Sequence, residues 1–409
     1  MRILQINSVC DFGSTGRTTR ELADYLEQQG HECYVAYGHR TTTYTKSMKI
    51  GGKWENHFHN AFFTRFLGLH GYGTQCGTSK LIKWIDKINP DIIHLRNLHA
   101  NYLNFPMLFE YIIKRQIPVI FTLHDCFNFT GKCSHYTAVK CYKWKNECYD
   151  CPVFHDCTAP SAFFDNSRKL FLQKKAYYEQ MNHLHVVAVS KWLAAEAKQS
   201  AMFASVANIQ CIYNWIDYSK FHRADTTEID AFYEKYNLSR DYKYLISVSQ
   251  GWNNKASRYK DALRLAKKLP PNYRLLLVGS VARGSFIESP LQHIPYINGS
   301  KELSAAYTMA AAYVHLSVED TFGKVIAEAM ACGTVPITFN STACGEVPGP
   351  YGFVVAPHDV DAIVKILPHL TEQQNLSDNI IQYVYDNYDY QTNAQKYLDL
   401  YNKILSSNK

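Results

Sequence analysis

Residues 317–337 have the sequence SVEDTFGKVIAEAMACGTVPI, and this stretch decides the fold that we expect. It reads in order as the end of an apolar strand, a polar loop, a short helix, a glycine stop at Gly333 and a second strand. We expect Asp320 and Thr321 to cap the helix. A helix that begins at the carboxyl edge of a parallel sheet presents backbone N–H donors and the positive end of its dipole, and both favour phosphate binding.

The rest of the chain continues this alternation of short β-rich runs and amphipathic stretches, which is typical of parallel sheets with crossover helices. The first half contains expected strands at Ile3–Asn7, Glu32–Tyr37, Asp91–Leu95, Pro118–Leu123, Leu184–Ser190 and Asn208–Tyr213. The second half contains expected strands at Tyr244–Val248, Arg274–Val278, Ala312–Leu316, Val335–Thr338 and Gly352–Val355. The expected helices include Thr18–Gln29, Lys260–Lys268, Glu302–Ala310, Gly323–Ala331 and Gln391–Ser406. The sequence therefore predicts an α/β protein with two Rossmann-like domains that bind ligands at the carboxyl ends of their strands.

The boundary between the two domains is expected where the strand pattern weakens, from Ile216 to Tyr242. A chain of 409 residues is long enough for two domains of ~200 residues each. We predict an N-terminal domain over residues 1–216 and a C-terminal domain over residues 217–387. The terminal helix, residues 388–409, is expected to pack back on the first domain.

Composition narrows the class of protein. The net charge of +7 is too mild to indicate a nucleic-acid partner. The first residues form an expected strand instead of a signal peptide, and no stretch approaches the ~18 apolar residues of a membrane span. We therefore expect a cytoplasmic protein, either free or peripheral on the inner face of the plasma membrane.

Charge is uneven along the chain. The segment from Arg40 to Asp86 contains seven basic residues and only two acidic ones, and it includes the aromatic run His57–Phe63. One interpretation is a surface for anionic lipid, where each nearby cation adds ~1 kcal/mol. The alternative is an ordinary solvated face.

Glu328 stands on the second turn of the expected helix among apolar neighbours. Burying a carboxylate is costly unless hydrogen-bond donors meet it, and the paired hydroxyls of a ribose are suitable donors. The alternative is a glutamate that faces solvent or pairs with a nearby lysine.

With its two acids seven residues apart around Phe322-Gly323, followed by Glu328-Ala329-Met330-Ala331, the motif resembles that of the family 4 retaining glycosyltransferases. The resemblance implies the GT-B fold, in which two Rossmann-like domains face each other across a cleft. This chain departs from the family pattern by having Asp320 as the first acid and by the reversed order Val335-Pro336. In the family, the first acid and the following backbone hold the donor sugar, the glycine-lysine region meets the diphosphate, and the second acid binds ribose. The donor-binding residues implied here are Thr321, Phe322, Gly323, Lys324, Val325 and Glu328, with Asp320 and Glu328 counted as catalytic.

Other segments resemble the same family in the expected order. Gly13, Gly16 and Arg17 follow the first strand, and the resemblance places them beside the diphosphate; a tight turn alone would also explain the glycines. His124 ends a buried strand, and the resemblance makes it the catalytic histidine that faces the donor sugar; the alternative is a histidine satisfied inside the fold. The diphosphate needs cations as negative charge grows on the leaving group. Lys255 and Arg258 are our candidates, with Lys260 in reserve.

Two further patterns concern metals. Four cysteines, Cys133, Cys141, Cys148 and Cys151, have thiols that a structural zinc ion uses as ligands, with Cys157 nearby; reduced thiols or a redox pair are the alternatives. The insert that carries them resembles one in a polysaccharide-biosynthesis subgroup of the family. The pair Asp359 and Asp361 is explained by helix capping, so we expect no catalytic metal and no cofactor beyond the nucleotide-sugar substrate.

Together these features predict a retaining glycosyltransferase that uses a nucleotide sugar, with a UDP-sugar as first choice and GDP-mannose as second. The expected acceptor is a glycan or lipid-linked glycan of a bacterial surface polysaccharide such as a capsule or lipopolysaccharide. Two rivals share these features: a nucleotide-sugar 2-epimerase of the same fold and a non-catalytic carbohydrate-binding protein. No pattern indicates an oligomeric state.

Overall fold

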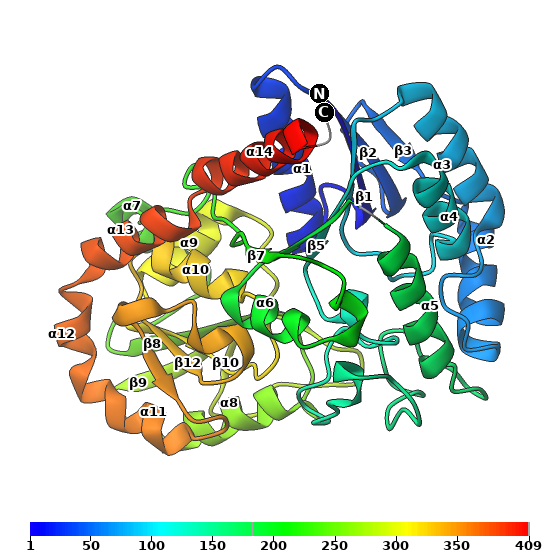
Figure 1. Ribbon diagram of the computed structural model, residues 1–409. Coiled ribbons are helices and arrows are strands. Elements are labelled where there is room, and N and C mark those ends of the chain that lie inside the picture. The colour runs from blue at the N-terminus through cyan, green and yellow to red at the C-terminus, as the bar shows by residue number, and fades with distance from the viewer. Residues whose placement is uncertain (182, 408–409) are drawn as a thin grey trace. The chain divides into compact units, whose positions relative to one another are not determined.

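The computed structural model describes residues 1–181 and 183–407, which fold into two compact units. Unit 1 contains Met1–Tyr213 and Asn393–Lys409, and unit 2 contains Asn214–Thr392. Each unit is built on one parallel sheet (Figure 1).

The sheet of unit 1 has seven strands in the order β3-β2-β1-β4-β5-β6-β7. Its strands are β1 (Arg2–Val9), β2 (Glu32–His39), β3 (Ser47–Lys49), β4 (Ile92–Leu95), β5 (Val119–Leu123), β6 (Leu184–Ala188) and β7 (Ile209–Cys211). All neighbouring strands run parallel, with Leu4 opposite Ile93, for example. Because helices cover both faces, the central strands are almost continuously apolar and buried.

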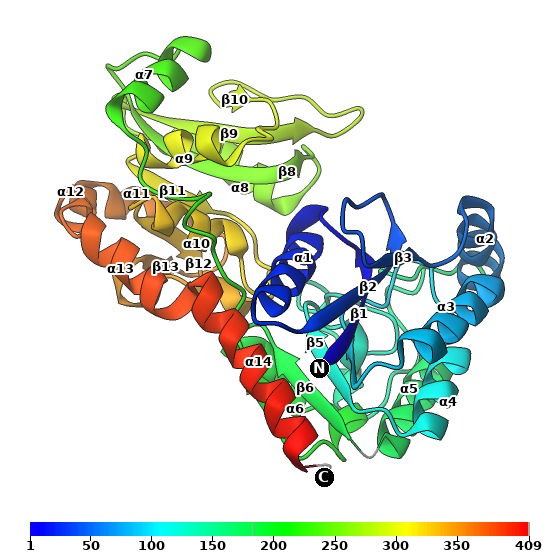
Figure 2. The ribbon, with the colours of Figure 1, turned by 90° about the horizontal axis from the view of Figure 1, so that it is seen from above.

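Helices lie on both faces of this sheet. The unit contains α1 (Gly13–Gln28), α2 (Lys53–Phe58) continued by a π-helix (His59–Phe66), α3 (Gln75–Ile88), α4 (Phe105–Arg115), α5 (Ser167–Gln180), α6 (Lys191–Lys198) and most of α14 (Tyr390–Ser407). Figure 2 shows α1 and α14 on one face and α3, α4 and α5 on the other.

The terminal helix α14 is fixed to the sheet of unit 1 by buried tyrosines. The Tyr401 hydroxyl lies 2.7 Å from Nδ1 of His94, and the Tyr397 hydroxyl lies 3.0 Å from the hydroxyl of Thr122. Residues 393–407 of this helix thus belong to the core of unit 1 although they are far from it in sequence.

The sheet of unit 2 has six parallel strands in the order β10-β9-β8-β11-β12-β13. Its strands are β8 (Lys243–Trp252), β9 (Tyr273–Val281), β10 (Gln292–Ile294), β11 (Ala312–His315), β12 (Pro336–Phe339) and β13 (Phe353–Val355). Its helices are α7 (Thr226–Lys235), α8 (Ser257–Lys268), α9 (Ser300–Thr308), α10 (Lys324–Ala331), α11 (Val360–Ile366), α12 (Leu370–Gln374) and α13 (Ser377–Tyr388). Helix α10 packs against α9 and α13, and α8 packs against α11.

The predicted α/β fold with two Rossmann-like domains is confirmed, and every expected strand is present with shifts at its ends. Strands β3 and β10 were not predicted, because three-residue edge strands leave almost no periodic signal. Helix α1 starts at Gly13, five residues before the expected Thr18, since the polar first turn lacks apolar periodicity. Strand β8 runs on to Trp252 because it pairs with β9 again after a bulge.

The expected capping of α10 by Asp320 and Thr321 is wrong. The residue before the helix is Gly323, with φ of 76° and no side-chain cap, because the left-handed backbone there turns the preceding loop away from the first turn. The capping role expected for Asp359 is confirmed, since its carboxylate accepts from the backbone N–H of Ala362 at 2.9 Å. Within the described residues no helix is long and apolar enough to cross a membrane.

Candidate functional site

The carboxyl ends of β8 and β11 in unit 2 border a pocket of ≈ 280 Å³. It is lined by Ser247, Val248, Ser249, Gln250, Trp252, Arg258, His315, Leu316, Ser317, Asp320 and Val325. The lining therefore brings together three of the predicted site residues, Arg258, Asp320 and Val325. A pocket in this position is where a doubly wound sheet binds its ligand.

Asp320 is held firmly at the edge of this pocket. Its carboxylate accepts a hydrogen bond from Nε2 of His315 at 2.8 Å, and its backbone N–H donates to the Thr342 hydroxyl at 3.1 Å. The other ring nitrogen of His315, Nδ1, lies 2.9 Å from the Tyr313 hydroxyl. Tyr313, His315 and Asp320 thus form a chain of hydrogen bonds from the sheet to the pocket.

His315 is buried between Tyr313 and Asp320, and its neighbours shift its pKa. Burial by itself lowers its pKa, but Tyr313, Cys344 and the hydrogen bond to Asp320 together raise the pKa well above the ordinary 6.5. His315, Asp320 and Cys344 also have ligand atoms within 4.8 Å of one another. His315 and Asp320 lie 2.8 Å apart, so the hydrogen bond between the two side chains accounts for their proximity without a metal ion.

Helix α10 points its first turn at the pocket through Val325. The positive end of the helix dipole therefore lies at the pocket. Gly323 is required at the turn before it, since a Cβ there would lie 2.7 Å from Cδ1 of Ile326 and its φ is positive. This local geometry fits an anionic group such as a phosphate.

Glu328 follows on the second turn of α10 and is buried, with 3% of its surface exposed. The alternative of a solvent-facing glutamate is thereby excluded. Glu328 does not belong to the residues that line the pocket, so it stands behind the first turn of the helix.

Of the other predicted residues of unit 2, Arg258 lines the pocket, whereas Lys255, Thr321, Phe322 and Lys324 do not. Arg258 donates to the backbone carbonyl of Gly251 at 3.0 Å and lies over the Trp252 ring, whereas Lys255 is exposed and does not line the pocket. Thr321 and Lys324 are half-buried. Phe322 is buried against Tyr388, at 5.2 Å between ring centroids, which is a packing role.

In unit 1, His124 lies just after β5 and is buried. Nη1 of Arg96 donates to Nε2 of His124 at 3.2 Å and lies 3.4 Å from the Thr18 hydroxyl of α1. Because a guanidinium only donates, Nε2 of His124 is the acceptor in this contact. Arg96 therefore joins α1, β4 and β5 at the carboxyl edge of this sheet.

Arg96 is fully buried, yet within the described chain its Nε and Nη2 atoms meet no hydrogen-bond acceptor. Burial lowers the pKa of its guanidinium. A buried donor without an acceptor costs roughly 1–3 kcal/mol, more when it is charged. An anionic ligand at this edge would supply the acceptors that these nitrogens lack.

The glycine-rich segment follows β1. Gly13 has a φ of 65° and starts α1, while a Cβ on Gly16 would lie 3.1 Å from Val9, so the turn is tight. Arg17 is exposed and its Nε donates to the carbonyl of Gly13 at 3.3 Å. Asp125, next to His124, is engaged elsewhere: its carboxylate accepts from His99 at 2.8 Å.

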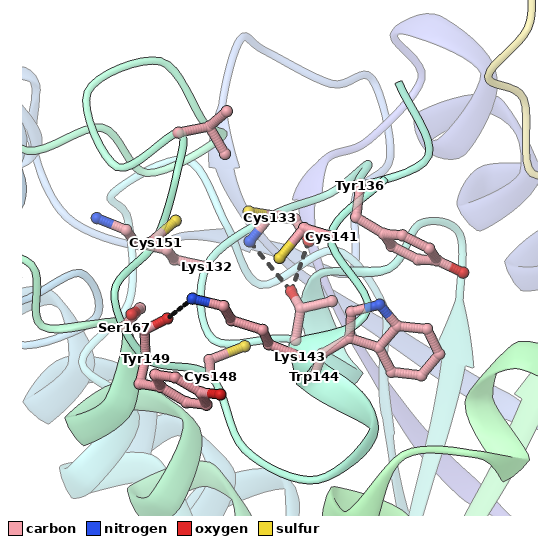
Figure 3. A pocket seen from close by; sticks show the side chains of 12 residues that line it. Lys132, Cys133, Tyr136, Cys141, Lys143, Trp144, Cys148, Tyr149, Cys151 and Ser167 are labelled. Carbon is pink, nitrogen blue, oxygen red and sulfur yellow. Dashed lines mark hydrogen bonds between the residues drawn. The ribbon is translucent and has the colours of Figure 1, made fainter. Parts of the chain in front are cut away.

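The four predicted cysteines line one narrow cavity of ≈ 20 Å³ in the segment before α5 (Figure 3). Interaction with the neighbouring Cys133 thiol lowers the pKa of Cys151 to about 7 and also lowers the pKa of Cys157. A tetrahedral zinc site with ~2.3 Å Zn–S bonds brings its sulfur atoms within ~4 Å of one another. Among the described residues, only His315, Asp320 and Cys344 have all three ligand atoms within 4.8 Å, so the thiols face a common cavity without closing on one point. The zinc ion stays a prediction.

Sequence reasoning missed His315 and assigned no role to Arg96. His315 is the last residue of the buried strand β11, and Arg96 directly follows the buried strand β4. In parallel sheets of this kind, ligands bind at the carboxyl ends of the strands. A polar residue at such a position was the available signal. Trp252 was missed because β8 was expected to end four residues earlier.

Comparison with known proteins agrees with this geometry. The family model described as "Glycosyltransferase Family 4" matches residues 15–220, and the one described as "Glycosyl transferases group 1" matches residues 228–387. The two matches correspond closely to the two structural units.

Two curated proteins are similar to this chain at low sequence identity. The chain is 24% identical over 244 residues to N-acetyl-alpha-D-glucosaminyl L-malate synthase of Bacillus anthracis, covering 55% of this chain and 61% of that protein. It is 23% identical over 199 residues to the putative colanic acid biosynthesis glycosyl transferase WcaC of Escherichia coli (strain K12), covering 44% and 46%. The chain thus spans about half the length of the curated relatives that it matches.

A solved structure of Anabaena Alr3699/HepE in complex with UDP and glucose superposes with a TM-score of 0.68 at 14% identity. The match covers 98% of this chain and 100% of that one, and it supports the fold alone.

Proposed function

The chain belongs to glycosyltransferase family 4, and we propose that it transfers a sugar from a UDP-sugar, with retention of configuration, to a lipid-linked glycan of a surface polysaccharide. Glycosyltransferase activity follows from the family. The donor, the acceptor and the stereochemistry are our inference.

One observation carries the donor assignment: the pocket at the carboxyl ends of β8 and β11 combines Arg258, the first turn of α10 and Asp320. We assign the diphosphate to the positive end of α10 and to Arg258, the sugar to Asp320 and the ribose to Glu328. In this arrangement, the Arg258 guanidinium and the dipole of α10 stabilise the negative charge that grows on the diphosphate as it leaves the sugar. UDP is preferred because structures of Anabaena HepE, a protein of the same fold, hold UDP or UDP-glucose.

Retention is proposed to occur on one face of the donor sugar, with a diphosphate oxygen taking the proton of the acceptor. A double displacement needs a carboxylate nucleophile beside the sugar. The carboxylate next to His124 in sequence, Asp125, accepts from His99 inside the fold, and Asp320, the carboxylate that we assign to the sugar, is held by His315. Trapping a covalent glycosyl-enzyme would refute the one-face mechanism.

The acceptor proposal rests on the likeness to a colanic acid biosynthesis protein and on the cysteine-rich insert. A lipid-linked acceptor also implies that the protein works at a membrane surface.

Thermal shift with a panel of nucleotide sugars tests the donor, because a ligand that binds only the folded state raises its melting temperature. We expect UDP-sugars to stabilise the wild type and to lose this effect in Glu328→Gln. Stabilisation by none of the nucleotide sugars, or an equal shift in Glu328→Gln, contradicts the donor assignment.

A further inference from the structure

An unpartnered aromatic ridge runs along α2 and the π-helix that continues it. Trp54, Phe58, Phe62 and Phe66 recur at every fourth residue, and Trp54 and Phe58 are 87% and 58% exposed. In an α-helix of 3.6 residues per turn, a strict four-residue spacing drifts around the axis, and the wider π-helical turns reverse that drift. The switch from α- to π-helix therefore keeps all four rings on one side.

From Phe58 onward the rings are in contact one after another, and the row reaches the segment that carries Phe163 and Phe164. Phe58 stacks on Phe62 at 5.3 Å and Phe62 on Phe66 at 5.9 Å between centroids, and Phe66 meets the exposed Phe163 edge-on at 5.3 Å. Backbone bonds hold this second segment in place, since Ala162 donates to the carbonyl of Arg65 at 2.7 Å. We call the rings of Trp54, Phe58, Phe62, Phe66, Phe163 and Phe164 the aromatic ridge.

A cationic pocket of ≈ 320 Å³ adjoins the ridge on the same helix. Its lining is Gly38, His39, Arg40, Lys49, Lys53, Asn56, His57, Asn60, Ala100 and Asn101, which among the described residues includes no carboxylate. Lys53 and His57 line the pocket, and the next residues in the chain, Trp54 and Phe58, belong to the ridge. Successive residues of a helix point ~100° apart, so pocket and ridge open on neighbouring sides of α2.

The charge around the ridge is uncompensated. In the part of the chain that the structure describes, Arg40, Lys53 and Arg65 form no ion pair, and the Lys49 ammonium donates only to the carbonyl of Arg40. Glu55, on the same helix, is turned to α3, where it accepts from the backbone N–H of Gly77. The surface thus combines exposed rings with unpaired cations.

We propose that α2 and its π-helical continuation form a docking surface for an anionic membrane, in which the ridge enters the interface and the cationic pocket holds a lipid phosphate. Helices with Trp and Phe on one side and Lys and Arg on the other lie in the plane of such interfaces. A second copy of the chain fits less well, because two ridges in contact would bring the cations of Arg40, Lys53 and Arg65 close to their own copies. A membrane-docked protein would be close to the proposed lipid-linked acceptor. The observations behind the docking surface all lie in unit 1 and do not depend on the proposed donor site in unit 2.

Flotation with vesicles tests it. The full chain is expected to float with phosphatidylcholine vesicles that contain about 30% phosphatidylglycerol, and much less with phosphatidylcholine alone or at high salt. Trp54→Ser with Phe58→Ser, and separately Arg40→Gln with Lys53→Gln, are expected to lower vesicle partitioning by about 10-fold or more. Matched controls in unit 2 are Phe286→Ser, which removes a ring that is 60% exposed, and Lys267→Gln; both should bind as the wild type does.

Three outcomes overturn the proposal: no flotation with anionic vesicles, equal losses in the controls, or a ridge-dependent dimer in sedimentation that does not bind vesicles. All substituted side chains are exposed, so melting temperatures should stay unchanged. Thermal shift by UDP-sugars separates the two proposals: a chain that binds vesicles but not UDP-sugars loses only the proposed donor, and the reverse result removes only the docking surface.

Discussion

Replacing Lys174 with methionine should change how the stability of unit 1 depends on pH. This lysine of α5 is only 4% exposed, and its Nζ donates to the carbonyls of Phe127 and Thr130 at 2.7 and 2.6 Å. It thereby ties α5 to the start of the cysteine-rich segment. Burial lowers the pKa of Lys174 to about 7, from an ordinary 10.5.

The size of the effect follows from these two pKa values. Their difference corresponds to a maximum of about 4.8 kcal/mol between the charged and neutral forms. Between them the unfolded chain binds more protons than the folded chain, so the contribution of Lys174 to stability rises with pH. From about pH 7.5 to about pH 9.5 the wild type should gain about 2.5 kcal/mol relative to Lys174→Met, whose side chain does not titrate.

Urea unfolding with pulsed hydrogen exchange of the α5 peptide, Ser167–Gln180, measures this difference in unit 1 alone. The control is Lys175→Met, where the neighbouring side chain is half-buried and pairs with Glu179 at the surface. Its difference from the wild type should not change with pH. A constant difference for Lys174→Met as well would refute the reasoning, because it would mean that the folded state keeps this ammonium charged.

Three further changes test the site. Glu328→Gln keeps the shape of a buried side chain but removes its charge; we expect donor binding to weaken ~10- to 100-fold by calorimetry, as for the loss of a hydrogen bond to a charged group, and unchanged binding would exclude the ribose role. His315→Gln removes the imidazole next to Asp320. Since the pKa of His315 is raised, its positive charge is present at low pH and is lost as pH rises through that pKa. The wild type should therefore lose donor affinity at alkaline pH, whereas the affinity of the variant should not change with pH. For the cysteine cavity we predict about one zinc per chain by mass spectrometry, reduced in Cys148→Ser and Cys151→Ser; metal-free chains with titratable thiols would contradict it.

The sequence was sufficient for the fold because its signals are local and repeated. Continuous apolar strands with amphipathic crossovers predict two parallel sheets, and the motif of residues 317–337 predicts where one of them binds its ligand. Glu328 was predictable as a buried residue, since its helical neighbours on both sides are apolar. Such features depend on neighbours within a few turns of the chain.

What escaped prediction depends on contacts between distant segments. Arg96 meets Thr18 and His124 only after helix α1 has packed beside the neighbouring strands β4 and β5. The cysteines behave likewise, because Cys133 interacts with Cys157 as well as with Cys151. The sequence positions of Cys133, Cys141, Cys148 and Cys151 do not reveal this grouping. The sequence also did not show that the rings of the aromatic ridge lie on one side of the helix. A π-helix has no established sequence signature, and the run His57–Phe63 alone does not indicate which rings are exposed.

The departure of this chain from its family at position 320 becomes intelligible through His315. An aspartate is one methylene shorter than the glutamate that the family motif has there, so its carboxylate stays closer to the strand that precedes it. In this structure that carboxylate is held by His315 at 2.8 Å, and His315 is in turn held by Tyr313 at 2.9 Å. A longer acid would carry its charge past this imidazolium, whereas the shorter one is fixed by it at the edge of the pocket. Asp320 and His315 therefore form a single hydrogen-bonded unit, in which the histidine fixes the position of the acid at the edge of the pocket.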